Sequence, residues 1–274
     1  MNTKTSSLLK FGLSLLLVCP AFAATSVTYD FEVESNGVPQ GDFFSDSVTG
    51  WSQDTTNPSA FGDSFPLAYI FSTAFAGGAS TNTGHLGTQF ANLPDNSSTT
   101  VSGVVDLPVT NALEVTLNLA IIDNTADAFA QRDAFSVALT NSASATIAQI
   151  DLTPTSGDDT SWDVSVGTGG AASATGSTIT ALNGYEFKIV FGATTNFYFG
   201  GAVQGAVIGL GPALPAVPGI SDLDAIAMTH NPLGLAGSSA NTLAFDNIVV
   251  IIPEPSSAIL AALGFSFLGR RRRS

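Results

Sequence analysis

Short stretches in which apolar and polar residues alternate recur along the middle of the chain. This period of two is typical of a β-strand with one buried face and one exposed face. The clearest stretches are 27–33, 113–121, 135–139, 147–152, 185–191 and 243–249. Outside the two ends, no stretch has convincing helical spacing. The pattern predicts an all-β fold built as a single β-sandwich, with a jelly roll as the favoured topology.

Turn-forming residues separate these stretches. Asn141 and Ser142 predict a tight turn between two strands. The Pro- and Gly-rich segment from Gly209 to Gly219 is predicted to be a loop or an insertion. Asp222 and Asp224 are expected to lie in a solvated loop, as is the pair at 158–159.

The N-terminal residues 1–23 have the three parts of a secretory signal peptide. Lys4 and Lys10 supply the positive start, residues 11–18 are apolar, and small residues follow at Ala21 and Ala23. Cleavage by signal peptidase is expected after Ala23, from a signal helix too short to span a bilayer. The alternatives are an uncleaved anchor and lipidation at Cys19, the single cysteine. Cleavage would leave no thiol, which excludes disulfides and cysteine chemistry.

The C-terminal residues 251–274 combine a Pro-Glu-Pro motif, an uncharged apolar segment and a cluster of arginines. The motif consists of Pro253, Glu254 and Pro255, and the arginines are Arg270, Arg271, Arg272 and Arg273. Arginines resist translocation, so this cluster predicts a cytoplasmic stop after a short transmembrane helix. Residues 24–250 between the two ends would form the exported β-sandwich domain.

This tail resembles the PEP-CTERM sorting signal of Gram-negative bacteria. The resemblance implies an inner-membrane precursor that an exosortase-type enzyme cuts near the Pro-Glu-Pro motif. It also implies export to the cell surface or the extracellular matrix, in hosts that typically make exopolysaccharide. An ordinary C-terminal membrane anchor that contains the motif by chance is the alternative.

The predicted exported domain is strongly acidic. It holds 21 of the 22 acidic residues and only two basic ones, Arg132 and Lys188, which gives a net charge of −19. Such a surface repels nucleic acid and anionic lipid, so nucleic-acid binding is excluded. Self-repulsion keeps it soluble, and its carboxylates can collect divalent cations.

The two ends of the domain resemble the first and last strands of jelly-roll carbohydrate-binding modules and galactose-binding-like domains. The residues that carry this resemblance are Tyr29-Asp30-Phe31-Glu32, Gly50-Trp51 and Phe245-Asp246-Asn247-Ile248-Val249. In such domains, acidic groups from these strands often share a structural calcium ion. The resemblance implies Glu32 and Asp246 as calcium ligands, with Asp30 as a third. The alternative is that these are solvent-facing strand residues.

Candidate hydrolase residues are few. Gly62-Asp63-Ser64 and His230 resemble the serine and histidine blocks of GDSL-type esterases, but Ala227 stands where that family has its aspartate. Without an orienting acid, the serine stays a weak nucleophile. His85 and His230 are the only histidines, which makes a zinc site improbable. A carboxylate pair of the glycosidase type stays open, because its spacing is spatial rather than sequential.

The sequence therefore favours a non-enzymatic surface or matrix protein that associates with glycan or exopolysaccharide. A secreted hydrolase and a purely structural adhesin are the alternatives. Trp51 and Trp162 could stack on sugar rings, but at alternating strand positions we expect them in the core.

Overall fold

The computed structural model describes most of one compact unit, which spans Thr25–Pro253. The described residues are 25–29, 31, 50–56, 68–74, 80–87, 98–108, 113–123, 132–201, 208–215, 222–231 and 241–252. The predicted signal peptide and the tail from Pro253 onward lie outside them, as do Asp30, Glu32 and Ser64. No helix within these ranges is long and apolar enough to cross a membrane.

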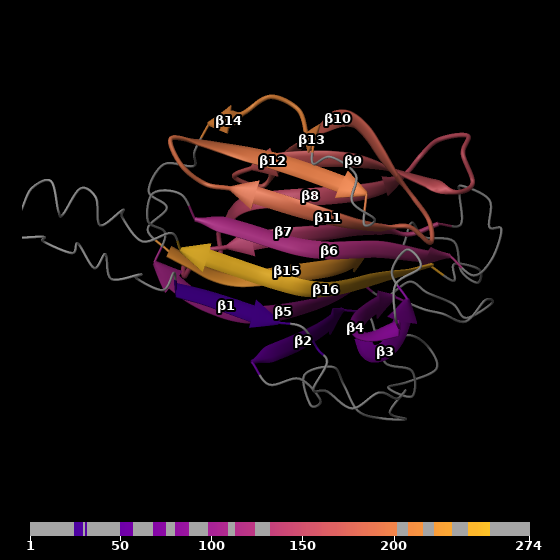
Figure 1. Ribbon diagram of the computed structural model, residues 1–274, viewed down its shortest axis with the longest axis horizontal. Coiled ribbons are helices and arrows are strands. Elements are labelled where there is room, and N and C mark those ends of the chain that lie inside the picture. Colours follow the sequence, from indigo (N-terminus) through magenta and orange to yellow (C-terminus); the bar gives the residue numbers. More distant parts are fainter. Residues whose placement is uncertain are drawn as a thin grey trace, which may run out of the picture. The chain divides into compact units, whose positions relative to one another are not determined.

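The chain in these ranges is all-β and forms two antiparallel sheets, consistent with a β-sandwich (Figure 1). The first sheet has nine strands. In spatial order these are β13 (Ile208–Gly209), β12 (Thr194–Gly201), β11 (Gly184–Val190), β6 (Glu114–Asp123), β16 (Asn241–Ile252), β4 (Ser80–Gly87) and β3 (Ala68–Ala74), with β1 (Thr25–Tyr29) paired to β16 and β14 (Leu214–Pro215) paired to β12.

The second sheet has seven strands. In spatial order these are β10 (Ala171–Thr180), β9 (Ser161–Thr168), β8 (Thr146–Pro154), β7 (Ala134–Thr140), β15 (Asp222–Asn231), β5 (Ser98–Pro108) and β2 (Trp51–Thr56). The chain crosses between the sheets several times, and two of these crossings run from β6 to β7 and from β15 to β16. These two crossings lie at the same end of the paired strands, because Asp123 pairs with Asn241 and Ala134 pairs with Asn231.

Apolar side chains from both sheets form one continuous core. On β6 and β7, buried residues alternate with half-buried ones, as expected for strands with one face on the core. Tyr29, Phe31, Trp51 and Phe245 form an aromatic cluster within it, in which the rings of Trp51 and Phe245 stack with centroids 5.8 Å apart. The Tyr29 hydroxyl also donates a hydrogen bond to the Val104 carbonyl, which ties β1 to β5 across the sheets.

The last strand, β16, has two partners along one edge. Residues 242–245 pair with β4, and residues 248–252 pair with β1. Its register with β6 shifts between Asp246 and Val249, and Asn247 has a φ of 49°. This combination is a β-bulge, which bends the strand where one partner replaces the other.

The strands predicted at 113–121, 135–139, 147–152, 185–191 and 243–249 are confirmed, as is the turn at Asn141. The strand predicted at 27–33 ends at Tyr29, and Phe31 has a left-handed φ of 54°. The segment predicted as a loop from Gly209 contains parts of two short strands, β13 and β14. Asp222 and Asp224 lie in β15 and not in a loop.

Candidate functional site

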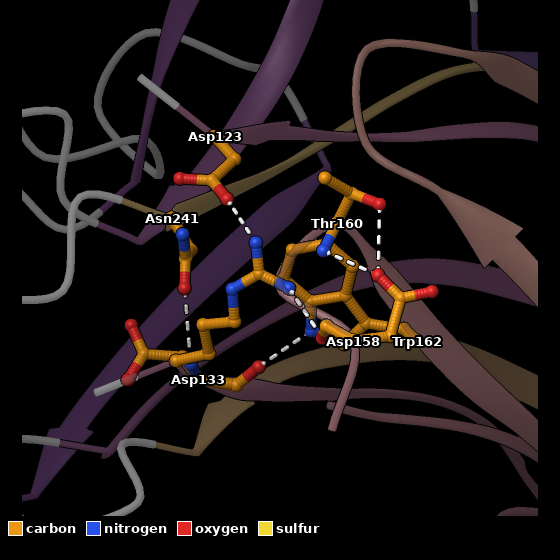
Figure 2. A network of polar contacts seen from close by, with 7 residues as sticks. Asp123, Asp133, Asp158, Thr160, Trp162 and Asn241 are labelled. Carbon is orange, nitrogen blue, oxygen red and sulfur yellow. Dashed lines mark hydrogen bonds and ion pairs between the residues drawn. The ribbon is translucent and has the colours of Figure 1, made fainter. Parts of the chain in front are cut away.

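A buried polar network lies at the end of the sandwich where the chain crosses between the sheets (Figure 2). At its centre is Arg132, which directly precedes Asp133 and β7 and is fully buried. Its Nη2 lies 2.7 Å from Oδ2 of Asp123, the last residue of β6 in the other sheet. Its Nη1 donates to the carbonyl oxygen of Asp158 at 3.4 Å. The ion pair therefore joins the two ends of the segment that connects the sheets.

The guanidinium group also contacts an aromatic ring. Its Cζ lies 4.6 Å from the ring centroid of Trp162 on β9, within the range of a cation–π interaction. The indole Nε1 of Trp162 donates to the carbonyl oxygen of Asp133 at 2.9 Å. Trp162 thus holds two consecutive residues in place. Its ring face contacts the guanidinium group of Arg132, and its N–H group bonds to the backbone of Asp133.

Asp133 provides a second link between the sheets. Its backbone N–H donates to Oδ1 of Asn241, the first residue of β16, at 3.2 Å. Its Oδ2 lies 2.9 Å from Nε2 of His230 on β15. This distance is typical of an ion pair, but the angles at these two atoms do not suit a hydrogen bond between them. The ring of His230 also lies against Phe135, with centroids 5.6 Å apart. Asp133 and His230 are both buried.

Asp158 lies at the outer rim of the network, in the turn between β8 and β9. Its Oδ1 accepts hydrogen bonds from the backbone N–H of Thr160 at 2.8 Å and from its hydroxyl at 2.9 Å. The backbone hydrogen bond from Thr160 is the largest cause that holds the pKa of this carboxyl below its usual value. The charged form of Asp158 thereby stabilises the turn that brings the Asp158 carbonyl oxygen to Arg132.

The structure corrects one premise about His230. The sequence offers no acid at Ala227 to orient this histidine, yet Asp133 contacts it from a distant part of the chain. His230 is fully buried, one residue before the end of β15. Ser64 lies outside the described residues, so the serine of the suggested esterase block has no position relative to His230.

Asp246, the described member of the proposed calcium ligands, lies on β16 at the bulge. It is 2% exposed, and its Oδ2 accepts a hydrogen bond from Nδ2 of Asn247 at 3.0 Å. Asp30 and Glu32 lie outside the described residues. In the part of the chain that the structure describes, no group of three or more His, Cys, Asp or Glu side chains could hold a metal ion. The calcium site stays a prediction.

The two tryptophans are buried in the core, as expected, and are not a surface platform for sugar. His85 on β4 is also fully buried, and burial lowers its pKa from 6.5 to about 3. This histidine is therefore neutral at physiological pH.

The outer face of the nine-stranded sheet carries a different set of side chains. On β11 and β12, Phe187 and Phe199 point into the core and stack at 5.8 Å, so Lys188 and Tyr198 point outward. Lys188 and Tyr198 are directly opposite each other in register. Lys188 Nζ lies 2.6 Å from Oε2 of Glu114 on β6, and the two side chains are 30% and 28% exposed. Tyr198 is half-buried and faces Gly209 of β13 on its other side.

No protein-family model matches the chain, and no curated protein matches it. Solved structures are similar at low identity. The CBM2 module of Lactobacillus casei BL23 phage J-1 evolved Dit is 14% identical, with a TM-score of 0.48 over 85% of this chain and 99% of that one. The T. cruzi calreticulin globular domain is 12% identical, with a TM-score of 0.46 over 90% and 94%.

A third similar structure is the xylan β-1,4-xylosidase from Bacillus halodurans C-125. It is 14% identical, with a TM-score of 0.41 over 62% of this chain. The chain spans 33% of the length of that enzyme. These similarities concern the fold, and none carries a residue role to this chain.

Proposed function

We propose that this chain is an exported bacterial surface or matrix protein that is sorted through its C-terminal segment. The observation that carries the proposal is the order of three elements: the Pro253-Glu254-Pro255 motif, the apolar stretch 258–268 and the arginines 270–273. The signal-like residues 1–23 support the same topology, with both positive ends in the cytoplasm. Signal peptidase and an exosortase-type enzyme at the inner membrane would process the precursor.

The exported domain, in this proposal, is a jelly-roll sandwich that associates with glycan and has no enzymatic activity. Both histidines of the chain, His85 and His230, are fully buried, which supports a role without proton transfer between histidine and a substrate. The acidic surface and the all-β body are suited to a soluble component of a hydrated matrix. Turnover of polysaccharide, ester or peptide by the purified protein would contradict this part of the proposal.

Processing of the tail can be tested in a host that encodes exosortase. Mass spectrometry of the mature protein is expected to find no peptide that contains Arg270–Arg273. Replacement of Pro253-Glu254-Pro255 by alanines is expected to leave the full-length chain in the membrane fraction. Replacement of Ser256 and Ser257 by alanines is the matched control and should leave sorting unchanged. Intact C-termini in wild-type cells would support a plain membrane anchor instead.

Glycan association is tested separately, with the exported protein purified from the medium or the cell surface. It is expected to co-sediment with exopolysaccharide from its host. Failure to bind while tail processing is normal would leave a purely structural surface protein.

A further inference from the structure

We propose that the outer face of the nine-stranded sheet around Tyr198 is a binding site for an uncharged polysaccharide. This inference rests on the glycan association proposed above and names the place and the ligand class. It concerns three neighbouring strands, β11, β12 and β13, whose pairing is antiparallel throughout.

The neighbour of Tyr198 on β13 is a glycine. This register partner is Gly209, which is exposed, and no heavy atom of the described residues lies within 4 Å of the position that its Cβ would occupy. Directly paired residues of antiparallel strands project to the same face, about 5 Å apart. A side chain at position 209 would therefore stand next to Tyr198 on this face, and glycine leaves that space free.

Residues with hydrogen-bonding side chains neighbour Tyr198 on the same face. Lys188 is opposite Tyr198 on β11, and Asn196 precedes it by two residues on β12, about 7 Å away along the strand. The Nδ2 of Asn196 donates to the Thr194 hydroxyl at 3.3 Å, which orients the amide. An aromatic ring with amide, ammonium and carboxylate groups on the same face offers an apolar surface for pyranose C–H groups and partners for hydroxyls.

The charges on this face favour a neutral ligand. Lys188 is neutralised by Glu114 at 2.6 Å, and Glu186, two residues before Lys188, is exposed. These three groups carry a net charge of −1 on a domain whose net charge is −19. The other basic residue of the domain, Arg132, is fully buried. An acidic polymer would meet repulsion with no free cation among these groups to offset it, whereas an uncharged polymer would not.

Affinity electrophoresis of the exported protein tests the site. The gels contain xyloglucan, galactomannan or dextran as uncharged polymers, and alginate as the acidic one. The wild-type protein is expected to be retarded by at least one uncharged polymer and to migrate freely in alginate. Tyr198→Ala should weaken that binding about tenfold or more, as loss of a central aromatic contact does. Tyr198→Phe keeps the ring and should bind within about threefold of the wild type.

Gly209→Phe tests the open space without removing any contact. The new side chain should block the ring and abolish retardation, while the melting temperature stays unchanged because the position is open. Gly192→Phe is the matched control, since Gly192 is also exposed but lies six residues from Tyr198, in the turn before β12. It should bind like the wild type.

The outcomes separate the site from the proposed function. Retardation that survives both Tyr198→Ala and Gly209→Phe would overturn the site and leave glycan association standing. Retardation by alginate alone, with or without added calcium, would overturn the uncharged ligand class. The absence of binding to any polymer of the panel and to host exopolysaccharide would overturn both.

Discussion

Arg132 and Asp123 form a buried ion pair between the two sheets, with Nη2 and Oδ2 2.7 Å apart. The Arg132 side chain is 0% exposed and the Asp123 side chain is 6% exposed. Lys188 and Glu114 form the other kind of pair, 2.6 Å apart and about 30% exposed on one face of a sheet. Each pair uses one of the two basic residues of the exported domain. Water screens the exposed pair, whereas the buried pair depends on its partners for solvation.

Substitution of the two basic residues should therefore have very different effects on stability. Arg132→Met leaves the buried carboxylate of Asp123 without its charge partner and should lower the free energy of unfolding by about 3–5 kcal/mol. Lys188→Met is the matched control and should cost about 0–1 kcal/mol. Urea denaturation monitored by tryptophan fluorescence measures both values. Equal costs for the two variants would contradict the structural role of the Arg132 network.

The buried His85 predicts a loss of stability in mild acid. Its pKa is about 3 in the folded chain and about 6.5 when unfolded. Below pH 6.5, the unfolded chain binds a proton that the folded chain does not. Stability contributed by neutral His85 is therefore complete above pH 6.5 and declines as the pH falls toward 3, with a loss of about 2 kcal/mol by pH 5.

Urea denaturation between pH 5 and 7 tests this dependence. In a His85→Gln variant, the total decrease in stability from pH 7 to pH 5 should be smaller than in the wild type by about 2 kcal/mol. The comparison between the two proteins removes the contribution of other groups. Parallel curves would show that His85 does not cause the dependence.

Gly84 on β4 allows a close approach of the aromatic cluster. A Cβ at this position would lie 2.3 Å from Cε2 of Phe245, which is far inside van der Waals contact. Gly84→Ala is expected to destabilise the fold by about 1–3 kcal/mol, because the packed ring has to move. Phe245→Leu in the same chain should recover part of that loss. Gly192→Ala, whose nearest contact is 3.7 Å away, should be neutral by thermal melting.

The strands that sequence patterns predicted correctly share large apolar residues on one face and polar residues on the other. Strand β10 was missed because Ala171–Thr180 consists of small and polar residues, and only Ile179 joins the core. Strand β15 was missed for a different reason. Its register with β5 shifts between Leu223 and Ala225. The buried residues before and after the shift therefore do not follow one alternating pattern.

The polar network could not be predicted, because its members are distant along the chain. Asp123, Arg132, Asp158 and Asn241 meet only when the two sheets stack and the crossing segments close one end. The sequence does contain one signal, since Arg132 is one of two basic residues among many acidic ones. An isolated cation in such a domain is a candidate for a specific buried partner. Which of the 21 carboxylates pairs with it depends on topology.

Calcium should stabilise the exported domain beyond the effect of ionic strength, if Asp246 is a ligand as the sequence predicts. Asp246 is 2% exposed at the β16 bulge, and a carboxylate this buried requires donors or cations around it. Micromolar Ca²⁺ is then expected to raise the melting temperature, and Asp246→Asn should remove that gain. Asp159→Asn, at an exposed turn position, is the matched control and should keep it. Equal stabilisation by Mg²⁺, or by NaCl at matched ionic strength, would show that divalent ions only screen the repulsion among carboxylates.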